Sequence, residues 1–470
     1  MVSLFFLKRN FAPKKVVPLP IFQYISLCLM HNKEGIRTGE SRRMKFLQNV
    51  LDEKKIPKDL LLLLVISGLY FLGVALSNTF VNVFLWKHTK SFIDIGLYNL
   101  MIVIFQPLTF LVSGRLAKKI DRVIVLRFGI SFLALFFISV LFLGNLARDF
   151  LLLFGILLGI GYGFFWCAFN ILTFEITEPD TRDFFNGFEG ILSSVGGMIG
   201  PAFAGWLISE LPNDLGYKWI FALSLALFAL AIFISFFINS RLAEGRFYLR
   251  RILMEKKNNP NWDDILDAHF VQGIREGTFF FIIGIWVFLT TKSEWALGKF
   301  TLIESAIMFL SYYAVSKWVK TDMRKKAILI GGLLLYGSVF LITFKLNYPL
   351  LLIYAVVTSI AYPLLTVPFT SLTFDTIGKG WKAKEMRIEY IVVRELYYNL
   401  GRIVSILLFL AVVMLFKNDE TGIRYLMLVI GAGHLAIYFC LSGLPLKREK
   451  RSMKNDARHP LRDGESGSPV

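Results

Sequence analysis

Long apolar runs alternate with short polar connections from residue 60 onward. A helix that crosses the roughly 30 Å hydrocarbon core of a bilayer needs about 20 predominantly apolar residues, because it rises about 1.5 Å per residue. Segments of this kind lie near residues 60–84, 92–113, 123–143, 150–174, 187–209, 217–239, 271–291, 296–316, 327–344, 349–374, 391–416 and 422–443. The pattern predicts an all-α polytopic membrane protein with twelve transmembrane helices.

A polar gap divides these spans into six plus six. The predicted parts are an N-terminal tail (1–58), an N-terminal six-helix bundle (59–239), a linker (240–270), a C-terminal six-helix bundle (271–443) and a basic tail (444–470). Residues 1–43 show no period that specifies a packed element, so we expect disorder there. Alternatively, the start codon has been assigned too far upstream, and the protein begins at Met44.

The two sets of spans resemble each other. The stretch at residues 173–197 is echoed about 200 residues later at residues 373–402. The matched positions are Phe174 with Phe374, Glu175 with Asp375, and Glu189 with Glu395. The chain therefore reads as one half built twice, in two pseudo-symmetric bundles.

The chain is strongly basic, with a formal net charge of +18, yet only 18% of its residues are charged and 55% are hydrophobic. Soluble proteins have about 25% charged residues, so the excess charge does not indicate a nucleic-acid partner here. If both termini are cytoplasmic, the inner segments hold 31 Lys or Arg and the outer loops hold nine. Because cytoplasmic loops carry the excess of Lys and Arg, we expect a multi-pass protein of the cell membrane with both tails and the linker in the cytoplasm.

The linker contains a basic amphipathic segment at residues 246–257. We expect its leucines and Ile252 to face the bilayer, while its three arginines meet the anionic headgroups of the inner leaflet. The acidic turn at residues 175–186 is predicted to pair with the basic loops at 114–122 or 240–257 when an inner gate closes.

Sites for metals, cofactors and enzymatic chemistry are not indicated. The three cysteines, Cys28, Cys167 and Cys440, lie far apart and read as small hydrophobes. There is no G-x-x-x-x-G-K-[ST] phosphate loop, which argues against ATP-driven transport. No His-Asp or Ser-His constellation has a credible spacing, so we expect no catalytic residues, no metal and no cofactor.

Twelve spans, a central linker and two similar halves resemble the major facilitator superfamily of secondary transporters. The loop GRLAKKIDR at residues 114–122 is similar to that family's loop signature, with Gly114 and Arg122 at its ends. This chain has Lys118 where the family usually has Asp, and Asp121 where it usually has Gly. The corresponding loop of the second half places Asp322 201 residues after Asp121. The resemblance implies a conformational gate at these loops.

The fifth span contains GGMIGPAFAG, which resembles the Gly-Pro motif in the fifth helix of the family's antiporters. Small residues such as Gly200 let a neighbouring backbone approach closely, and Pro201 removes a helix hydrogen bond and permits a bend. A helix-packing seam and a gate that bends during exchange are both open interpretations.

Charged residues inside apolar spans are costly and usually face the bundle interior, where they mark a pathway. Those within about two turns of the predicted cytoplasmic helix ends are candidates for an inner gate: Arg127, Glu189, Arg275, Glu276, Arg394 and Glu395. Arg275 and Glu276 are candidates for substrate or proton binding as well. Glu304 and Arg402 lie roughly halfway through spans eight and eleven. They are the leading candidates for substrate binding and proton coupling, and the alternative is a permanent ion pair between them.

Polar and aromatic stripes point to the walls of a central cavity. On span eleven, Glu395, Tyr398, Asn399 and Arg402 share one helical face. Further stripes lie at Asn99 and Gln106, at Tyr162, Trp166 and Asn170, and at Tyr354, Thr358 and Tyr362. Packing is the alternative for each of these stripes. His434 in span twelve, at the periphery of the resembled fold, reads as a hydrogen-bonded structural histidine.

These features predict a secondary active transporter that moves a small solute by alternating access. Proton coupling is expected, and the Gly-Pro motif favours export or antiport. A sensor or scaffold that keeps the fold without transport, and a membrane-embedded transferase, are the alternatives. The expected partners are a small-molecule substrate and the lipid bilayer, and we expect a monomer.

Overall fold

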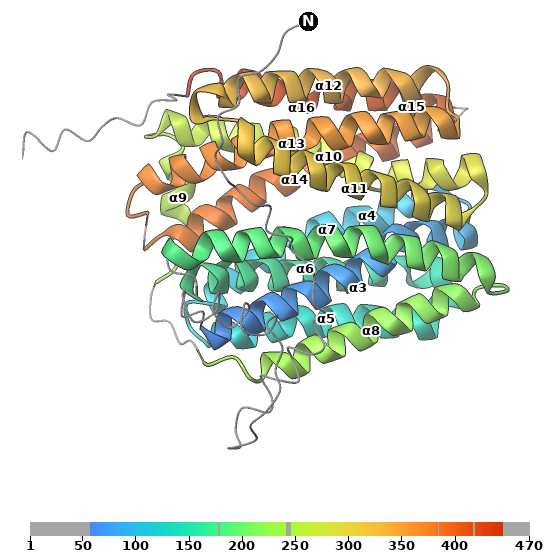
Figure 1. Ribbon diagram of the computed structural model, residues 1–470, viewed down its shortest axis with the longest axis horizontal. Coiled ribbons are helices and arrows are strands. Elements are labelled where there is room, and N and C mark those ends of the chain that lie inside the picture. Colours follow the sequence, from blue (N-terminus) through green and yellow to red (C-terminus); the bar gives the residue numbers. More distant parts are fainter. Residues whose placement is uncertain (1–56, 177–178, 241–245, 384, 417–418, 445–470) are drawn as a thin grey trace, which may run out of the picture. The chain divides into compact units, whose positions relative to one another are not determined.

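The apolar runs form α-helices, because a helix bonds its backbone polar groups internally where a bilayer offers no water. The computed structural model describes residues 57–444 apart from 177–178, 241–245, 384 and 417–418, and it holds no strand within them (Figure 1). The predicted all-α polytopic architecture is therefore confirmed. The predicted disorder of residues 1–43 falls outside the described residues.

The helices follow the predicted spans with longer ends. The first half contains α3 (Lys58–Thr89), α4 (Phe92–Leu116), α5 (Arg122–Leu143), α6 (Ala147–Ile176), α7 (Pro179–Glu210) and α8 (Leu215–Ser235). The linker contains α9 (Leu249–Glu255). The second half contains α10 (Pro260–Thr291), α11 (Glu294–Trp318), α12 (Arg324–Phe344), α13 (Tyr348–Lys379), α14 (Arg387–Leu415), α15 (Asp419–Gly431) and α16 (Gly433–Leu441).

Eleven segments among the described residues are long and apolar enough to cross a membrane, with α15 and α16 counted as one. The more polar α11, 25 residues long, lies between two of them and completes the twelve predicted spans. The last span differs from the prediction because it is divided at Ala432 into two shorter helices.

The first and second helices of each half are joined by the same two-residue turn. Lys90 and Lys292 both adopt the left-handed conformation, with φ of 54° and 52°. The serine that follows each lysine caps the next helix. The side chain of Ser91 accepts a hydrogen bond from the Asp94 backbone N–H, and that of Ser293 accepts one from the Ala296 backbone N–H. These matching turns are a structural counterpart of the internal repeat.

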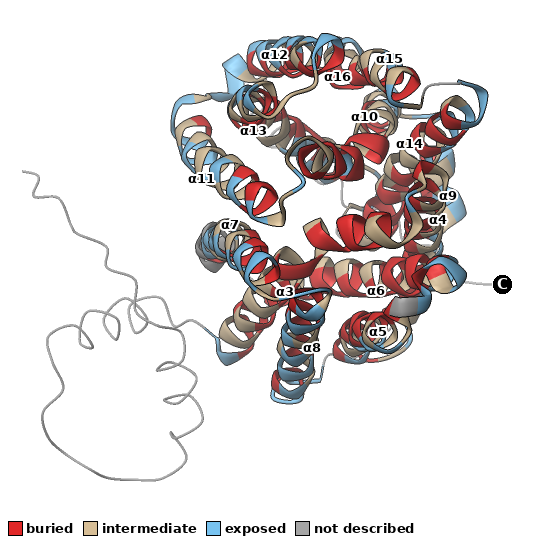
Figure 2. Cartoon of the chain, turned by 90° about the vertical axis from the view of Figure 1, so that its right-hand side faces the viewer, coloured by how far each residue is buried: buried red, intermediate tan, exposed pale blue. Residues whose placement is uncertain are grey.

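The helices of each half pack mainly on one another, and α4 with α14 and α7 with α11 join the halves. In Figure 1 the blue-to-green helices α3–α8 lie below the yellow-to-red helices α10–α16. Figure 2 shows that buried residues lie on the helix faces turned toward neighbouring helices, while exposed residues lie on the outer faces. We call the end of the bundle where α3 begins and α9 lies the linker end.

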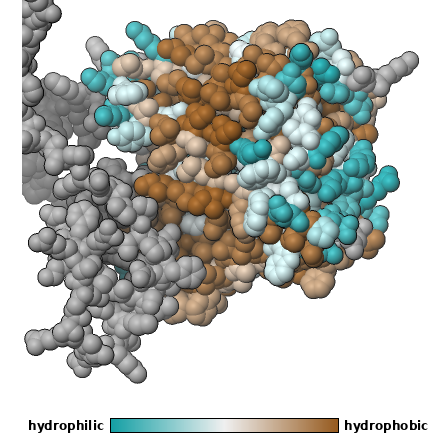
Figure 3. Space-filling model, turned by 45° about the vertical axis from the view of Figure 1, so that its right-hand side comes forward, coloured by the Kyte–Doolittle hydropathy of each residue, from teal (hydrophilic) through white to brown (hydrophobic). Residues whose placement is uncertain are grey.

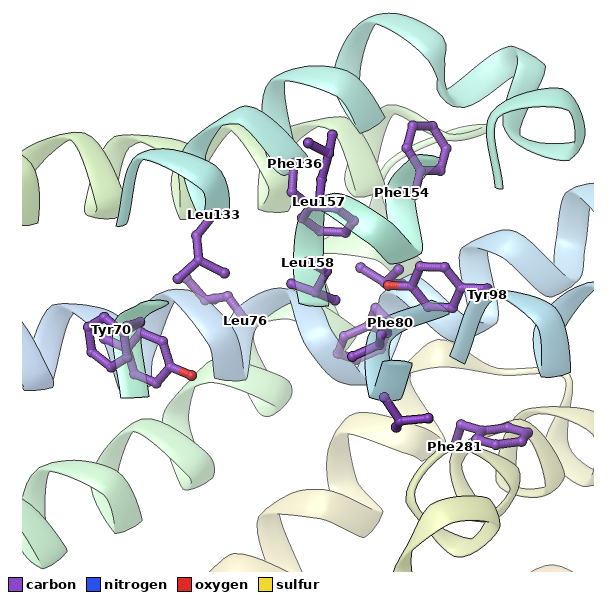
Figure 4. Packing of buried hydrophobic residues seen from close by; sticks show 14 of the residues in the cluster. Tyr70, Leu76, Phe80, Tyr98, Leu133, Phe136, Phe154, Leu157, Leu158 and Phe281 are labelled. Atoms are coloured by element: carbon purple, nitrogen blue, oxygen red, sulfur yellow. The ribbon is translucent and has the colours of Figure 1, made fainter. Parts of the chain in front are cut away.

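The core contains a large apolar cluster built from both halves. Figure 4 shows Phe281 of α10 together with Phe80 of α3 and Tyr98 of α4, and all three belong to this cluster. The outer surface is apolar as well: Phe142 and Leu415 expose 82% and 80% of their area. Figure 3 shows a broad apolar surface with hydrophilic residues gathered toward its margins. A surface of this kind suits lipid rather than water.

The sequence predicts that the linker helix faces lipid with its apolar side, but in the structure this side is packed against the protein. Ile252 is fully buried and belongs to a second apolar cluster with Trp262 and Tyr390. The prediction for this residue is wrong because α10 begins at Pro260 and α14 begins at Arg387, so both helices extend far enough to cover α9.

Candidate substrate cavity

A cavity of about 600 Å³ lies between the two halves, with walls from α3, α4, α6, α10, α11, α12, α13 and α14. Its polar and charged lining residues include Asn78, Asn82, Gln106, Tyr162, Arg275, Glu276, Glu304, Tyr354, Thr358, Tyr362, Tyr398 and Arg402. A volume of this size suits a small organic molecule.

Arg402 lies near the middle of α14 and reaches across to the first half. Its Nη1 donates to Gln106 Oε1 of α4 at 3.2 Å and to Asn399 Oδ1 at 3.1 Å. Its guanidinium carbon lies 5.5 Å and 5.8 Å from the ring centroids of Tyr398 and Phe280. Its Nε is buried without a hydrogen-bond partner. This cation is therefore held by neutral groups.

Glu276 of α10 is the centre of a hydrogen-bond network. Its Oε1 accepts from Gln272 at 3.0 Å and Tyr362 at 3.1 Å, and its Oε2 accepts from Tyr398 at 2.5 Å. His434 Nε2 of α16 lies 3.4 Å from Oε1. Four neighbours on α10, α13, α14 and α16 thus satisfy this one carboxylate.

Arg275 and Glu304 face the same cavity. Arg275 donates to the Tyr354 hydroxyl at 2.9 Å, and its guanidinium carbon lies 3.8 Å from the ring centroid of Phe279. Glu304 makes no hydrogen bond and no ion pair with the residues that the structure describes, and Arg275 is the charged group with which it interacts at longer range. No ion pair within 4 Å joins Glu304 to Arg402, which are both described.

The depth predicted for Arg275 and Glu276 was wrong. The sequence placed them within two turns of the cytoplasmic end because the apolar run begins at residue 271, but α10 begins at Pro260. Both residues therefore lie near the middle of the helix and line the cavity with Arg402 and Glu304.

The stripes predicted from spacing reach the cavity in part. Tyr162 and Trp166 line it, and Asn170 is not among its lining residues. Asn399 supports Arg402 from behind and donates to Glu395 Oε1 at 3.0 Å. His434 is hydrogen-bonded, as predicted, but it is fully buried toward Glu276 rather than peripheral. No local signal in span twelve indicates that contact.

At the linker end, Lys118 of the loop after α4 forms a buried ion pair with Glu389 of α14. Lys118 also donates to the Arg246 carbonyl oxygen at 3.1 Å, and Glu389 accepts from the Tyr248 backbone N–H at 3.1 Å. This pair ties the first half, the linker and the second half together. Sequence reasoning missed Glu389 because it was assigned to a polar loop.

The loops at the linker end repeat one ion pair in each half. Arg122 pairs with Glu175 where α5 begins and α6 ends, and Arg324 pairs with Asp375 at 2.8 Å where α12 begins and α13 ends. Asp121 caps α5 by accepting from the Val123 N–H at 2.8 Å. The predicted pairing of the acidic turn is thus found for Glu175, and the side chains at residues 179–184 lie outside the described residues.

The other predicted gate residues make fewer contacts. Asp322 is exposed in a short turn before α12. Glu189 makes no hydrogen bond or ion pair with any described residue, and within the same part of the chain Arg394 pairs only with its neighbour Glu395, at 3.6 Å. Arg127 donates to a serine at the end of α8, at 3.1 Å, so its contact stays within the first half.

The Gly-Pro segment is a packing seam on two sides of α7. A Cβ on Gly200 would lie 2.9 Å from Leu76 N of α3. A Cβ on Gly298 of α11 would lie 2.6 Å from the carbonyl oxygen of Pro201. Gly114 is also covered, since a Cβ there would lie 3.1 Å from side chains of the linker and of α14. The predicted close approach of backbones is found, and it joins the two halves.

The end of the bundle opposite the linker end has its own cross-half contact, which the sequence did not indicate. Lys87 of α3 pairs with Glu294 of α11 at 3.2 Å, and Tyr217 of α8 donates to the same carboxylate at 3.0 Å. Contacts between the halves therefore occur at both ends, with the cavity between them.

The sequence profile of the Major Facilitator Superfamily matches residues 63–405. The chain belongs to the major facilitator superfamily. This confirms the predicted family and supports a membrane transporter.

The chain is also similar to two bacterial relatives and shares its fold with one solved structure. It is 54% identical over 418 residues to the uncharacterized protein YqgE of Bacillus subtilis, covering 88% of this chain and 97% of that protein. It is 60% identical over 178 residues to an uncharacterized Geobacillus stearothermophilus protein in the sodM 3' region, covering 38% of this chain and 83% of that protein. The crystal structure of the human organic anion transporter MFSD10 (TETRAN) shares the fold, with a TM-score of 0.60, 15% identity, and coverage of 82% of this chain and 100% of that one.

Proposed function

We propose that this chain is a secondary active transporter that moves a small solute through the cavity by alternating access. The observation that carries the proposal is the placement of four charged side chains, Arg275, Glu276, Glu304 and Arg402, in a cavity between two halves that make contacts at both ends. Charged groups at such depth are costly, and a transport pathway is the usual reason for them.

We assign proton coupling to Glu304. Its carboxyl lines the cavity without a hydrogen bond or ion pair to any described residue, unlike that of Glu276, so its charge can be balanced by a proton or by the nearby Arg275. A switch between these two partners would link proton release to a change in the cavity. Binding and release of a proton at Glu304 would then couple transport to the proton gradient.

The gate at the linker end is assigned to Lys118, with Gly114, Asp121 and Arg122 around it, and Asp322 in the corresponding loop of the second half. Glu395, Arg394 and Glu189 lie between this end and the cavity.

The Gly-Pro seam at Gly200 and Pro201 supports export by antiport, because a tight seam between the halves limits leakage during exchange. We place both tails in the cytoplasm of a cell membrane and expect a monomer.

The test is transport by the purified full-length chain in liposomes that contain a pH-sensitive dye. Solutes from a panel of organic acids, amines, sugars and neutral aromatics are added outside, with and without an imposed pH gradient. The expected result is proton movement that depends on one class of solute and is absent from empty liposomes. Absence of solute movement under any gradient, with the protein folded, would refute secondary transport.

A further inference from the structure

We propose that the substrate is a small organic anion, whose oxyanion group is held by Arg402 with help from Arg275, and whose apolar body lies against the aromatic wall of the cavity. This inference rests on the proposed transport function and names the class of its substrate. It follows from three features of the described residues.

The first feature is the unused side of the Arg402 guanidinium. Only Nη1 donates to described residues, and both acceptors, on Gln106 and Asn399, are uncharged amide oxygens. Nε is buried without a partner, and Nη2 makes no hydrogen bond to a described residue. Nε and Nη2 together form the edge of a guanidinium that binds carboxylate, sulfonate or phosphate with two parallel hydrogen bonds. A buried donor left without an acceptor is costly, so a ligand that supplies one is favoured.

The second feature is the charge of the cavity. Two guanidinium groups, Arg275 and Arg402, face two carboxyl groups, Glu276 and Glu304. Neither arginine has a carboxylate partner within 4 Å among the described residues. Glu276 is already satisfied by four neighbours, one of them His434. When Glu304 carries a proton, two cations remain against one anion, and a monoanionic solute neutralises the site.

The third feature is the wall on which the rest of the solute lies. Phe279 and Phe280 flank the two arginines, and Tyr162 and Trp166 line the side formed by the first half. These rings match an aromatic or aliphatic body attached to the oxyanion group. A cation or a zwitterion that uses Glu304 for its ammonium group is the competing class.

The experiment measures binding to the purified full-length chain by isothermal titration calorimetry with one naphthalene ring and different headgroups. The anions are 2-naphthoate, 2-naphthalenesulfonate and 2-naphthyl phosphate, and the matched probes are 2-naphthalenemethanol and 2-naphthylmethylammonium. At least one anion is expected to bind roughly tenfold or more tighter than the alcohol, as one charge-assisted interaction implies. The three anions separate carboxylate, sulfonate and phosphate recognition.

Two variants assign the site. Arg402→Gln is expected to reduce the ratio of anion to alcohol affinity roughly tenfold or more, and Arg402→Lys is expected to restore part of it, since it keeps charge but loses the two-point geometry. An unchanged ratio in Arg402→Gln, equal or tighter binding of the ammonium probe, or no anion binding at all would overturn the proposal. If Arg402→Gln does not fold, the series on the unmodified chain decides.

Failure of this inference is distinguishable from failure of the transport proposal. Anion binding without solute movement in liposomes removes transport and keeps the anion site. Coupled transport of a cation or a neutral solute that Arg402→Lys leaves unchanged keeps transport and removes the anion site.

Discussion

Lys118 and Glu389 form a buried ion pair across the two halves, although they are 271 residues apart in the chain. Their side chains expose 8% and 0% of their area. The family usually has an Asp at the position of Lys118. In this chain the loop residue carries the opposite charge, and its partner is a carboxylate on α14. The linker backbone at Arg246 and Tyr248 completes the cluster.

Replacing Lys118 should destabilise the protein. Lys118→Met leaves the Glu389 carboxylate buried and unpaired, and breaking a buried pair in this way typically costs about 3–5 kcal/mol. The double variant Lys118→Met with Glu389→Leu should lose less than the sum of the two single variants. Unfolding titrations in detergent measure the free energies of unfolding and give the coupling between the two positions.

Lys119 is the matched control for this cycle, because it is the exposed neighbour of Lys118. Lys119→Met should change the free energy of unfolding by less than about 0.5 kcal/mol. Equal effects of the two methionine variants would show that the ion pair contributes nothing to stability.

The seam between α7 and α11 should not accept a methyl group. In Gly298→Ala the new Cβ would lie 2.6 Å from the Pro201 carbonyl oxygen, which belongs to the backbone and cannot rotate away. Overpacking of this kind costs about 1–3 kcal/mol, so the melting temperature should fall. Gly337→Ala on α12 is the control, since nothing lies within 4 Å of its Cβ and the helix gains about 0.5–1 kcal/mol. A melting temperature that rises in both variants would contradict the seam.

The network around Glu276 should depend on the Tyr398 hydroxyl. Tyr398→Phe removes a 2.5 Å hydrogen bond to a partly buried carboxylate and should cost about 1.5–3 kcal/mol of unfolding free energy. The neighbouring Tyr397→Phe keeps the ring that Lys256 contacts, so it should cost far less. Thermal unfolding of both variants makes the comparison, and equal losses would argue against the network.

The number and order of the spans were predictable from sequence, because the length of an apolar run is set by the bilayer. The start of the apolar run at residue 271 was a poor measure of depth along α10, since residues 260–270 are amphipathic rather than apolar and belong to the same helix. That error misplaced Arg275 and Glu276 by depth. Arg402 and Glu304 were placed correctly near helix middles, because both lie far from the ends of their runs.

Partners distant in the chain were not predictable. Glu389 looks like a loop residue until the fold brings Lys118 to it, and His434 looks isolated until α16 meets Glu276. The same applies to Lys87 and its contact with α11. Helical spacing identifies residues that share a face, but it does not identify which face of another helix lies opposite.

Glu304→Gln tests proton coupling directly. The amide is close in size to the protonated carboxyl but cannot release a proton, so a carrier that depends on Glu304 should lose transport driven by a pH gradient. Exchange of solute between the two sides, which needs no net proton movement, should continue.

Both activities are measured in liposomes with the same solute. Exchange is measured with solute on both sides of the membrane, and net transport is measured after a pH step. Glu210→Gln is the control, because it also removes an acid without a hydrogen bond to a described residue, but Glu210 is exposed at the end of α7 and absent from the cavity wall. Normal gradient-driven accumulation by Glu304→Gln would remove Glu304 as the coupling residue.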